Sequence, residues 1–170
     1  MPVTIASLED TPALTALINS AYRGEASKKG WTTEADIIEG SLRTDESNIK
    51  ELMLEPDTVF LKYSNEKSEI EGCVFLQKKE GKLYLGMLSV SPAVQAKGTG
   101  KQLMIAAEDY ARQLECPAIF MQVISIRYEL IAWYERQGYQ KTGETEPFPT
   151  DNPFGIPKHP LEFLILEKSI

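Results

Sequence analysis

One stretch of the chain, Leu83–Leu103 (LYLGMLSVSPAVQAKGTGKQL), constrains the fold more than any other. Its first part, up to Val90, is rich in apolar, β-branched and aromatic residues, which predicts a strand, and Pro92 ends that strand. Two glycines, Gly98 and Gly100, follow one residue apart, and apolar residues then recur at helical spacing. The stretch therefore predicts a strand, a glycine-rich turn and a long helix in direct succession.

This arrangement favours the binding of a phosphate or pyrophosphate group. The first backbone N–H groups of a helix have no partner within the helix, and the positive end of the helix dipole lies behind them. Gly98 and Gly100 lack side chains, so a ligand can approach the backbone closely. A P-loop does not fit, because Gln95 and Gln102 stand where it requires Gly and Ser or Thr. A dinucleotide fingerprint does not fit either, because Leu103 replaces its third glycine.

The motif that remains, Gln95-x-x-Gly98-x-Gly100 after a strand, resembles the acyl-coenzyme A signature (Gln/Arg)-x-x-Gly-x-(Gly/Ala) of the Gcn5-related N-acetyltransferase (GNAT) superfamily. A second stretch, Glu129–Tyr139 (ELIAWYERQGY), resembles the late helix of that superfamily, whose pattern is aromatic-Tyr-Glu-basic-x-Gly-aromatic. The apolar strand predicted at Ala118–Ile124 lies between the two motifs. Their order and spacing carry more weight than either motif alone.

The order of predicted elements is similar to the fold of this superfamily across nearly the whole chain. The resemblance implies an α/β (α+β) fold, in which a mixed, mostly antiparallel central sheet of about six or seven strands is flanked by helices, and residues 1–170 form a single domain. In the N-terminal half, a second helical region is expected to begin near Thr32-Thr33-Glu34 and to carry Ile37, Ile38 and Leu42. Pro147–Pro160, with five prolines and one glycine, is expected to be a long irregular loop.

The resemblance implies that acetyl-coenzyme A is the co-substrate and lies between the strand ending at Val90 and the strand Ala118–Ile124. The end of the first strand would pair with the pantetheine arm as an added strand does, and amides of the glycine-rich turn would hold the pyrophosphate. No metal is expected in such a site. The expected cofactor-binding residues are Leu88, Ser89, Val90, Gln95, Ala96, Lys97, Gly98, Thr99, Gly100, Lys101 and Arg127. Arg127 stands where many members have Asn, so two readings stay open: its guanidinium reaches a phosphate, or it is exposed.

Tyr134 is the expected general acid. Acyl transfer to an amine expels a thiolate, and a tyrosine hydroxyl near the sulfur can donate a proton or a hydrogen bond to it. The alternative is a core tyrosine on an amphipathic helix. The general base stays open, because Gly86 occupies the position at which some members carry a glutamate. A water chain or Glu34 are the candidates, although Glu34 is also a typical residue for the first turn of a helix.

The formal net charge of −7 argues against a nucleic-acid partner, which would favour a basic surface. Cys73 and Cys116 have no partner at metal-ligand spacing and are expected to be buried. The start of the chain leads directly into a predicted strand and no apolar run is long enough to span a membrane, so a cytoplasmic location without a membrane partner is expected. His159, the only histidine, supports no hydrolase triad.

Three functions remain to be compared. The first is an N-acetyltransferase acting on a primary amine, either a small molecule or a protein, as a monomer or a homodimer. The second is a non-catalytic module of the same fold that binds acyl-coenzyme A as a sensor. The third, a nucleotide-binding oxidoreductase, is disfavoured by Leu103. Trp31, Phe148 and Phe154 are candidates for lining an acceptor site.

Overall fold

The computed structural model describes residues 2–23, 34, 38–39, 42–94, 98–149, 155–158 and 160–170. The strands are β1 (Val3–Ile5), β2 (Ile38–Glu39), β3 (Thr58–Ser64), β4 (Ile70–Lys79), β5 (Lys82–Val90), β6 (Ala118–Ile124), β7 (Gln140–Pro147), β8 (Ile156–Pro157) and β9 (Glu162–Ser169). The α-helices are α1 (Thr11–Tyr22), α3 (Glu46–Leu54), α4 (Thr99–Gln113) and α5 (Tyr128–Arg136), and the short 3-10 helices are η1 (Leu8–Asp10) and η2 (Pro92–Val94).

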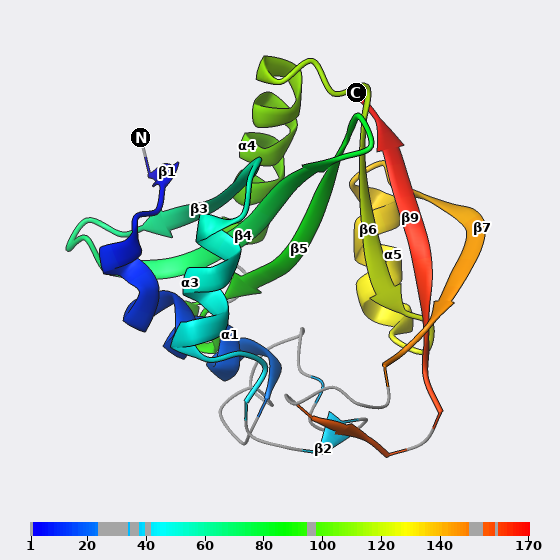
Figure 1. Cartoon of the computed structure of the whole chain (residues 1–170), viewed down its shortest axis with the longest axis horizontal. Coiled ribbons are helices and arrows are strands. Elements are labelled where there is room, and N and C mark those ends of the chain that lie inside the picture. Colours follow the sequence, from blue (N-terminus) through cyan, green and yellow to red (C-terminus); the bar gives the residue numbers. More distant parts are fainter. Residues whose placement is uncertain are drawn as a thin grey trace.

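One large sheet runs through the molecule, with helices on both of its faces (Figure 1). Its seven strands have the order β1-β3-β4-β5-β6-β9-β7. Every neighbouring pair is antiparallel except β5 and β6, which are parallel. The expected mixed, mostly antiparallel sheet of six or seven strands is thereby confirmed.

Strand β3 illustrates how the sheet separates two cores. Val59 and Leu61 point to the face on which Leu103 of α4 packs, and α5 contributes to the same cluster. Phe60, between them in sequence, packs on the opposite face in a cluster with Leu14 of α1, to which α3 also contributes. Successive side chains of a strand point to opposite faces, so one apolar strand supplies both cores.

The strand and the helix of this stretch form as the local pattern predicts: β5 ends at Val90, η2 follows, and α4 begins at Thr99. The strand Ala118–Ile124 and the late helix are also confirmed, the helix beginning at Tyr128 and ending at Arg136. Both cysteines are buried and free.

The parallel strands β5 and β6 are joined only near their beginnings. Their ladder consists of the pairs Leu83↔Ile119 and Tyr84↔Phe120. Beyond these pairs the two strands diverge, as Figure 1 shows. The end of β5 is therefore separated from its neighbour in the middle of the sheet.

A bulge accompanies this divergence. Met87 has a φ of 52°, and the register between β4 and β5 shifts between Cys73 and Phe75. An inserted residue bends its strand and increases the local twist. The bulge therefore re-aims the last residues of β5, which are those expected to contact the cofactor.

Two expectations are wrong, one about a helical region and one about a loop. Ile38 lies in β2 rather than in a helix, and Pro147–Pro160 is not entirely irregular, because it contains β8. The two short strands pair with each other across the chain, Ile38 with Pro157. Leu42 also lies outside any helix. Thr32, Thr33 and Ile37, which belong to the expected helical region, lie outside the described residues.

Candidate active site

The glycine-rich turn is described from Gly98 onward, whereas Gln95, Ala96 and Lys97 lie outside the described residues. Gly98 is the residue before the first turn of α4 and has a φ of 75°, in the left-handed region that favours glycine. The turn borders a pocket of about 630 Å³. Its lining residues are Val90, Gly98, Thr99, Gly100, Lys101, Glu129, Ala132, Trp133, Arg136 and Gln137. We call this the turn pocket.

Gly100 is buried in the wall of the turn pocket, where α4 approaches α5 and β5. A Cβ atom at this position would lie 3.6 Å from the Trp133 ring and 3.7 Å from the Val90 side chain. These are ordinary van der Waals contacts, so a methyl group would fit, but a larger side chain would extend into the pocket.

A second cavity, of about 90 Å³, lies where β5 and β6 diverge, and we call it the cleft cavity. Residues 85–88 of β5 and 121–124 of β6 form its two sides. Tyr134 of α5 also lines this cavity, whereas its neighbour Trp133 lines the turn pocket. On β5, Leu88 lines the cleft cavity and Val90 lines the turn pocket. The end of β5 and one turn of α5 therefore contribute residues to the walls of both spaces.

Tyr134 is only 5% exposed. Burial of its hydroxyl raises the pKa of Tyr134 well above its usual value of 10. The group is therefore protonated at neutral pH and available as a hydrogen-bond donor. The sequence left a core tyrosine as the alternative to a residue of the site. Tyr134 has both properties, because its ring belongs to the core cluster of α4 and α5 and the residue also lines the cleft cavity.

The last turn of α1 reaches the same cavity through Tyr22, whose hydroxyl donates a hydrogen bond of 2.5 Å to the carbonyl of Leu88. This contact ties α1 to the part of β5 expected to pair with the pantetheine arm. The Tyr22 side chain is buried, and burial raises its pKa, so the hydroxyl stays a donor. In the sequence, Tyr22 is one member of an apolar helical stripe, and nothing in the pattern indicates this role.

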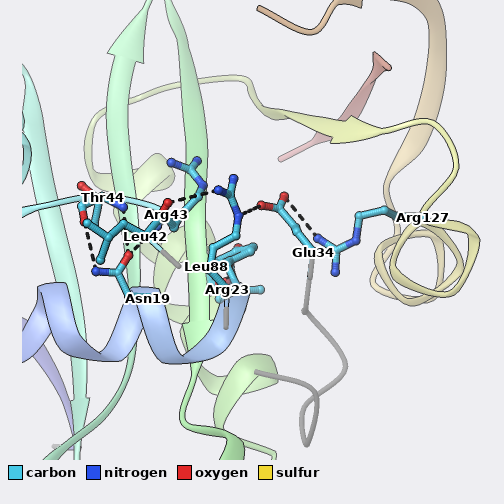
Figure 2. Close-up of polar contacts among 9 residues, drawn as sticks. Asn19, Arg23, Glu34, Leu42, Arg43, Thr44, Leu88 and Arg127 are labelled. Atoms are coloured by element: carbon cyan, nitrogen blue, oxygen red, sulfur yellow. Dashed lines mark hydrogen bonds and ion pairs between the residues drawn. The ribbon is translucent and has the colours of Figure 1, made fainter. Parts of the chain in front are cut away.

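A buried ion-pair cluster borders the cleft cavity (Figure 2). Glu34 accepts from Arg23 Nε at 2.9 Å through Oε1, and Arg127 Nη1 lies 3.6 Å from its Oε2. The side chains of Glu34 and Arg127 are each 9% exposed, and that of Arg23 is 1% exposed. Buried charges are costly unless they are paired, so the three side chains depend on one another.

This cluster changes the reading of two candidates. Arg127 is not an exposed residue, so that alternative is wrong, and it lines the cleft cavity rather than the turn pocket. Each carboxylate oxygen of Glu34, a candidate base, faces a guanidinium group. A contact between Arg127 and the cofactor stays a prediction.

The aromatic residues expected at an acceptor site are not brought together in the described part of the chain. Phe148 packs against Phe163 in a small cluster with Ile38 and does not line the cleft cavity. Trp31 and Phe154 lie outside the described residues, as does His159. Gly86, by contrast, lines the cleft cavity. The sequence showed only that this position lacks the glutamate that some family members carry.

Neither a metal site nor a membrane helix emerges from the described residues. No group of three or more His, Cys, Asp or Glu side chains in this part of the chain is arranged to hold a metal ion. No helix described here is long and apolar enough to cross a membrane.

Comparisons with known proteins agree with this geometry. Residues 15–139 match the family model described as acetyltransferase (GNAT) family. Ribosomal-protein-alanine N-acetyltransferase from Brucella melitensis is 17% identical and superposes with a TM-score of 0.74, over 100% of each chain. The ribosomal-protein-S18-alanine N-acetyltransferase from Escherichia coli is 14% identical, with a TM-score of 0.72 over 99% of this chain and 92% of that one.

A third solved structure, yncA from Salmonella typhimurium, contains its cofactor acetyl-coenzyme A. It is 18% identical, with a TM-score of 0.68 over 98% of this chain and 92% of that one. At such identities the solved structures establish the fold only. No curated protein sequence matches the chain.

Proposed function

Because the chain belongs to the GNAT family of acetyltransferases, we propose that it transfers an acetyl group from acetyl-coenzyme A to a primary amine, directly in a ternary complex, with Tyr134 as the general acid. The observation that carries this proposal is the position of Tyr134, which is buried, protonated at neutral pH and in the wall of the cleft cavity. A cavity between diverging strands is a suitable place for a thioester and an amine to meet.

The two spaces suggest how the cofactor would lie. The pyrophosphate would bind at the start of α4, where backbone N–H groups and the helix dipole attract negative charge. Lys101 lines this pocket and adds a positive charge. The pantetheine arm would follow β5 from Val90 to Leu88, pairing with backbone groups including those of Ser89. This path ends in the cleft cavity beside Tyr134, where the thioester would react.

The reaction needs one proton donor and one proton acceptor. The amine nitrogen attacks the thioester carbonyl carbon, and the tetrahedral intermediate collapses as the carbon–sulfur bond breaks. The Tyr134 hydroxyl would donate a proton or a hydrogen bond to the departing sulfur, and the nitrogen would release its extra proton to water. Glu34 is a weaker candidate for the acceptor, because both of its oxygens are engaged by arginines.

Cofactor binding is tested by Gly100→Val. The valine methyl groups would extend into the turn pocket, so we expect the affinity for acetyl-coenzyme A to fall by about 10- to 100-fold, measured by calorimetry. Gln102→Val is the matched control, because it places the same side chain on an exposed position of α4 outside the pocket. Unchanged affinity in a folded Gly100→Val protein would contradict the cofactor assignment.

Catalysis is tested by free-thiol release from acetyl-coenzyme A with a panel of amine acceptors. Release that depends on the acceptor supports an enzyme. Binding of acetyl-coenzyme A without release for any acceptor would support the non-catalytic sensor module instead.

A further inference from the structure

We propose that the acceptor carries a carboxylate next to its amine, as a free α-amino acid does, and that Arg43 binds this carboxylate. This inference rests on the proposed acetyl transfer and names the substrate class of that site. It starts from Arg43, a cation in the wall of the cleft cavity to which the sequence analysis assigned no role.

The backbone around Arg43 is fixed to α1. Asn19 accepts hydrogen bonds through Oδ1 from the backbone N–H groups of Arg43, at 2.6 Å, and Thr44, at 2.9 Å. Its Nδ2 donates to the carbonyl of Thr44 at 3.0 Å. Three bonds from one side chain therefore hold this segment in place.

The guanidinium of Arg43 lies over the ring of Tyr22, 5.7 Å from its centroid. The hydroxyl of the same tyrosine reaches Leu88, so Arg43 is positioned close to the end of β5. Arg43 and Tyr134 line the same cavity of about 90 Å³. An acceptor that contacts both therefore needs its amine and its anionic group close together.

The charges around the cleft cavity indicate that Arg43 binds an anionic ligand. Within the described part of the chain, no carboxylate forms an ion pair with Arg43. Glu34, the carboxylate among the residues that line the cleft cavity, is held by Arg23 and Arg127 (Figure 2). Since a planar guanidinium binds a carboxylate through two parallel hydrogen bonds, Arg43 is suited to this ligand.

The rest of the acceptor has room to extend. The cleft cavity shares Arg43, Tyr84, Gly86, Met87 and Gln122 with an adjoining groove. Three glutamates and one lysine also line this groove: Glu55, Glu80, Glu146 and Lys79. With the carboxylate on Arg43, an amino-acid side chain would enter the groove, whose acidic rim favours neutral or cationic side chains.

The test compares L-leucine and L-glutamine with their C-terminal amides as acceptors, in the wild type and in Arg43→Gln. For each acceptor, kcat/KM of the variant is divided by that of the wild type, so the intrinsic reactivity of the amine cancels. We expect Arg43→Gln to lower kcat/KM for the free amino acids by about 10- to 100-fold, mainly through KM, and to leave the amides nearly unchanged.

Lys79→Gln is the matched control. Lys79 is also a cation over a tyrosine ring, 4.7 Å from the centroid of Tyr84, but it lines the groove and not the cleft cavity. We expect Lys79→Gln to change kcat/KM by the same factor for the free amino acids and for their amides.

The outcomes separate this inference from the proposed function. Equal losses for amino acids and amides in Arg43→Gln would overturn the assignment of Arg43. If the wild-type protein acetylates the amides but not the free amino acids, the carboxylate acceptor is overturned and acetyl transfer still stands. If acetyl-coenzyme A binds but neither acceptor class releases thiol, the carboxylate acceptor is overturned, and the wider amine panel decides whether acetyl transfer stands.

Discussion

Two neighbouring tyrosines, Tyr134 and Tyr139, have ring centroids 6.1 Å apart but different surroundings for their hydroxyls. Tyr134 lines the cleft cavity. Tyr139 is 2% exposed, and its buried hydroxyl has no hydrogen-bond partner among the described residues. Replacing either tyrosine by phenylalanine removes only the hydroxyl group. Comparing the two variants therefore separates a catalytic role of the Tyr134 hydroxyl from the effect of losing a buried hydroxyl.

We expect Tyr134→Phe to lower the turnover number by about 100-fold, at the lower end of the range for general acid catalysis, because thiolates leave readily. The affinity for acetyl-coenzyme A should stay nearly unchanged, since the hydroxyl acts in the transition state. Turnover at a saturating acceptor concentration and a cofactor binding constant are the measurements. Tyr139→Phe should keep wild-type turnover, and a Tyr134→Phe protein that does the same would show that Tyr134 is a core residue.

At the residue scale, sequence reasoning was most successful where a motif is contiguous. The positions of Gly98, Gly100 and Tyr134 follow from local patterns, although their roles stay predictions. The cluster of Arg23, Glu34 and Arg127 could not be predicted, because its members come from three separate segments and pair only after folding.

At the element scale, the strand–turn–helix from β5 to α4 was predictable because each part has a strong local period. The ladder between β2 and β8 was not, because each strand has two residues and its partner is far away in sequence. Ile38 and Leu42, four residues apart, also fit a helical period, so a helix was the better local choice for these two residues.

The link between α1 and the segment that carries Arg43 gives a prediction at this scale. Asn19→Ala removes three hydrogen bonds to that segment. We expect the free energy of unfolding to fall by about 1–3 kcal/mol. We also expect KM for a free amino acid to rise by about 10-fold, because the bound position of Arg43 is no longer fixed, while the affinity for acetyl-coenzyme A is unchanged.

Asn65→Ala is the control for this variant. Asn65 also accepts two backbone hydrogen bonds through Oδ1, from Lys67 and Glu69, but in the exposed turn between β3 and β4. For Asn65→Ala, we expect urea unfolding to show a lower stability and acceptor kinetics to show an unchanged KM. If Asn65→Ala and Asn19→Ala raise KM equally, the link from α1 does not position Arg43.

At the scale of the whole molecule, three tyrosines are buried in the cores on the two faces of the sheet: Tyr22, Tyr134 and Tyr139. Burial raises the pKa of each above its usual value of 10. Between pH 10 and these higher values, the folded chain retains protons that the unfolded chain has lost. Stability from this source is therefore complete below pH 10 and is lost as the pH rises above it.

We expect the free energy of unfolding to fall steeply above pH 10, with these three tyrosines contributing up to about 4 kcal/mol for each pH unit. Urea unfolding at about pH 8 and about pH 11 measures this. Tyr139→Phe should make the decline shallower by up to about 1.4 kcal/mol per pH unit, since one group is removed. A decline equally steep in that variant would contradict the contribution of Tyr139.

The divergence of β5 from β6 has a further consequence, for the behaviour of the protein in a crowded solution. A strand edge without a neighbouring strand is a template on which other chains can add, and proteins protect such edges against aggregation. The end of β5 leaves its neighbour after Tyr84, but it does so in the middle of the sheet, with β6 and β9 beyond it. We expect a narrow, flexible arm such as pantetheine to enter that space, whereas β6 and β9 block the edge of another folded sheet. On the proposed binding mode, the fold would offer backbone groups to a small molecule without offering them to a second protein.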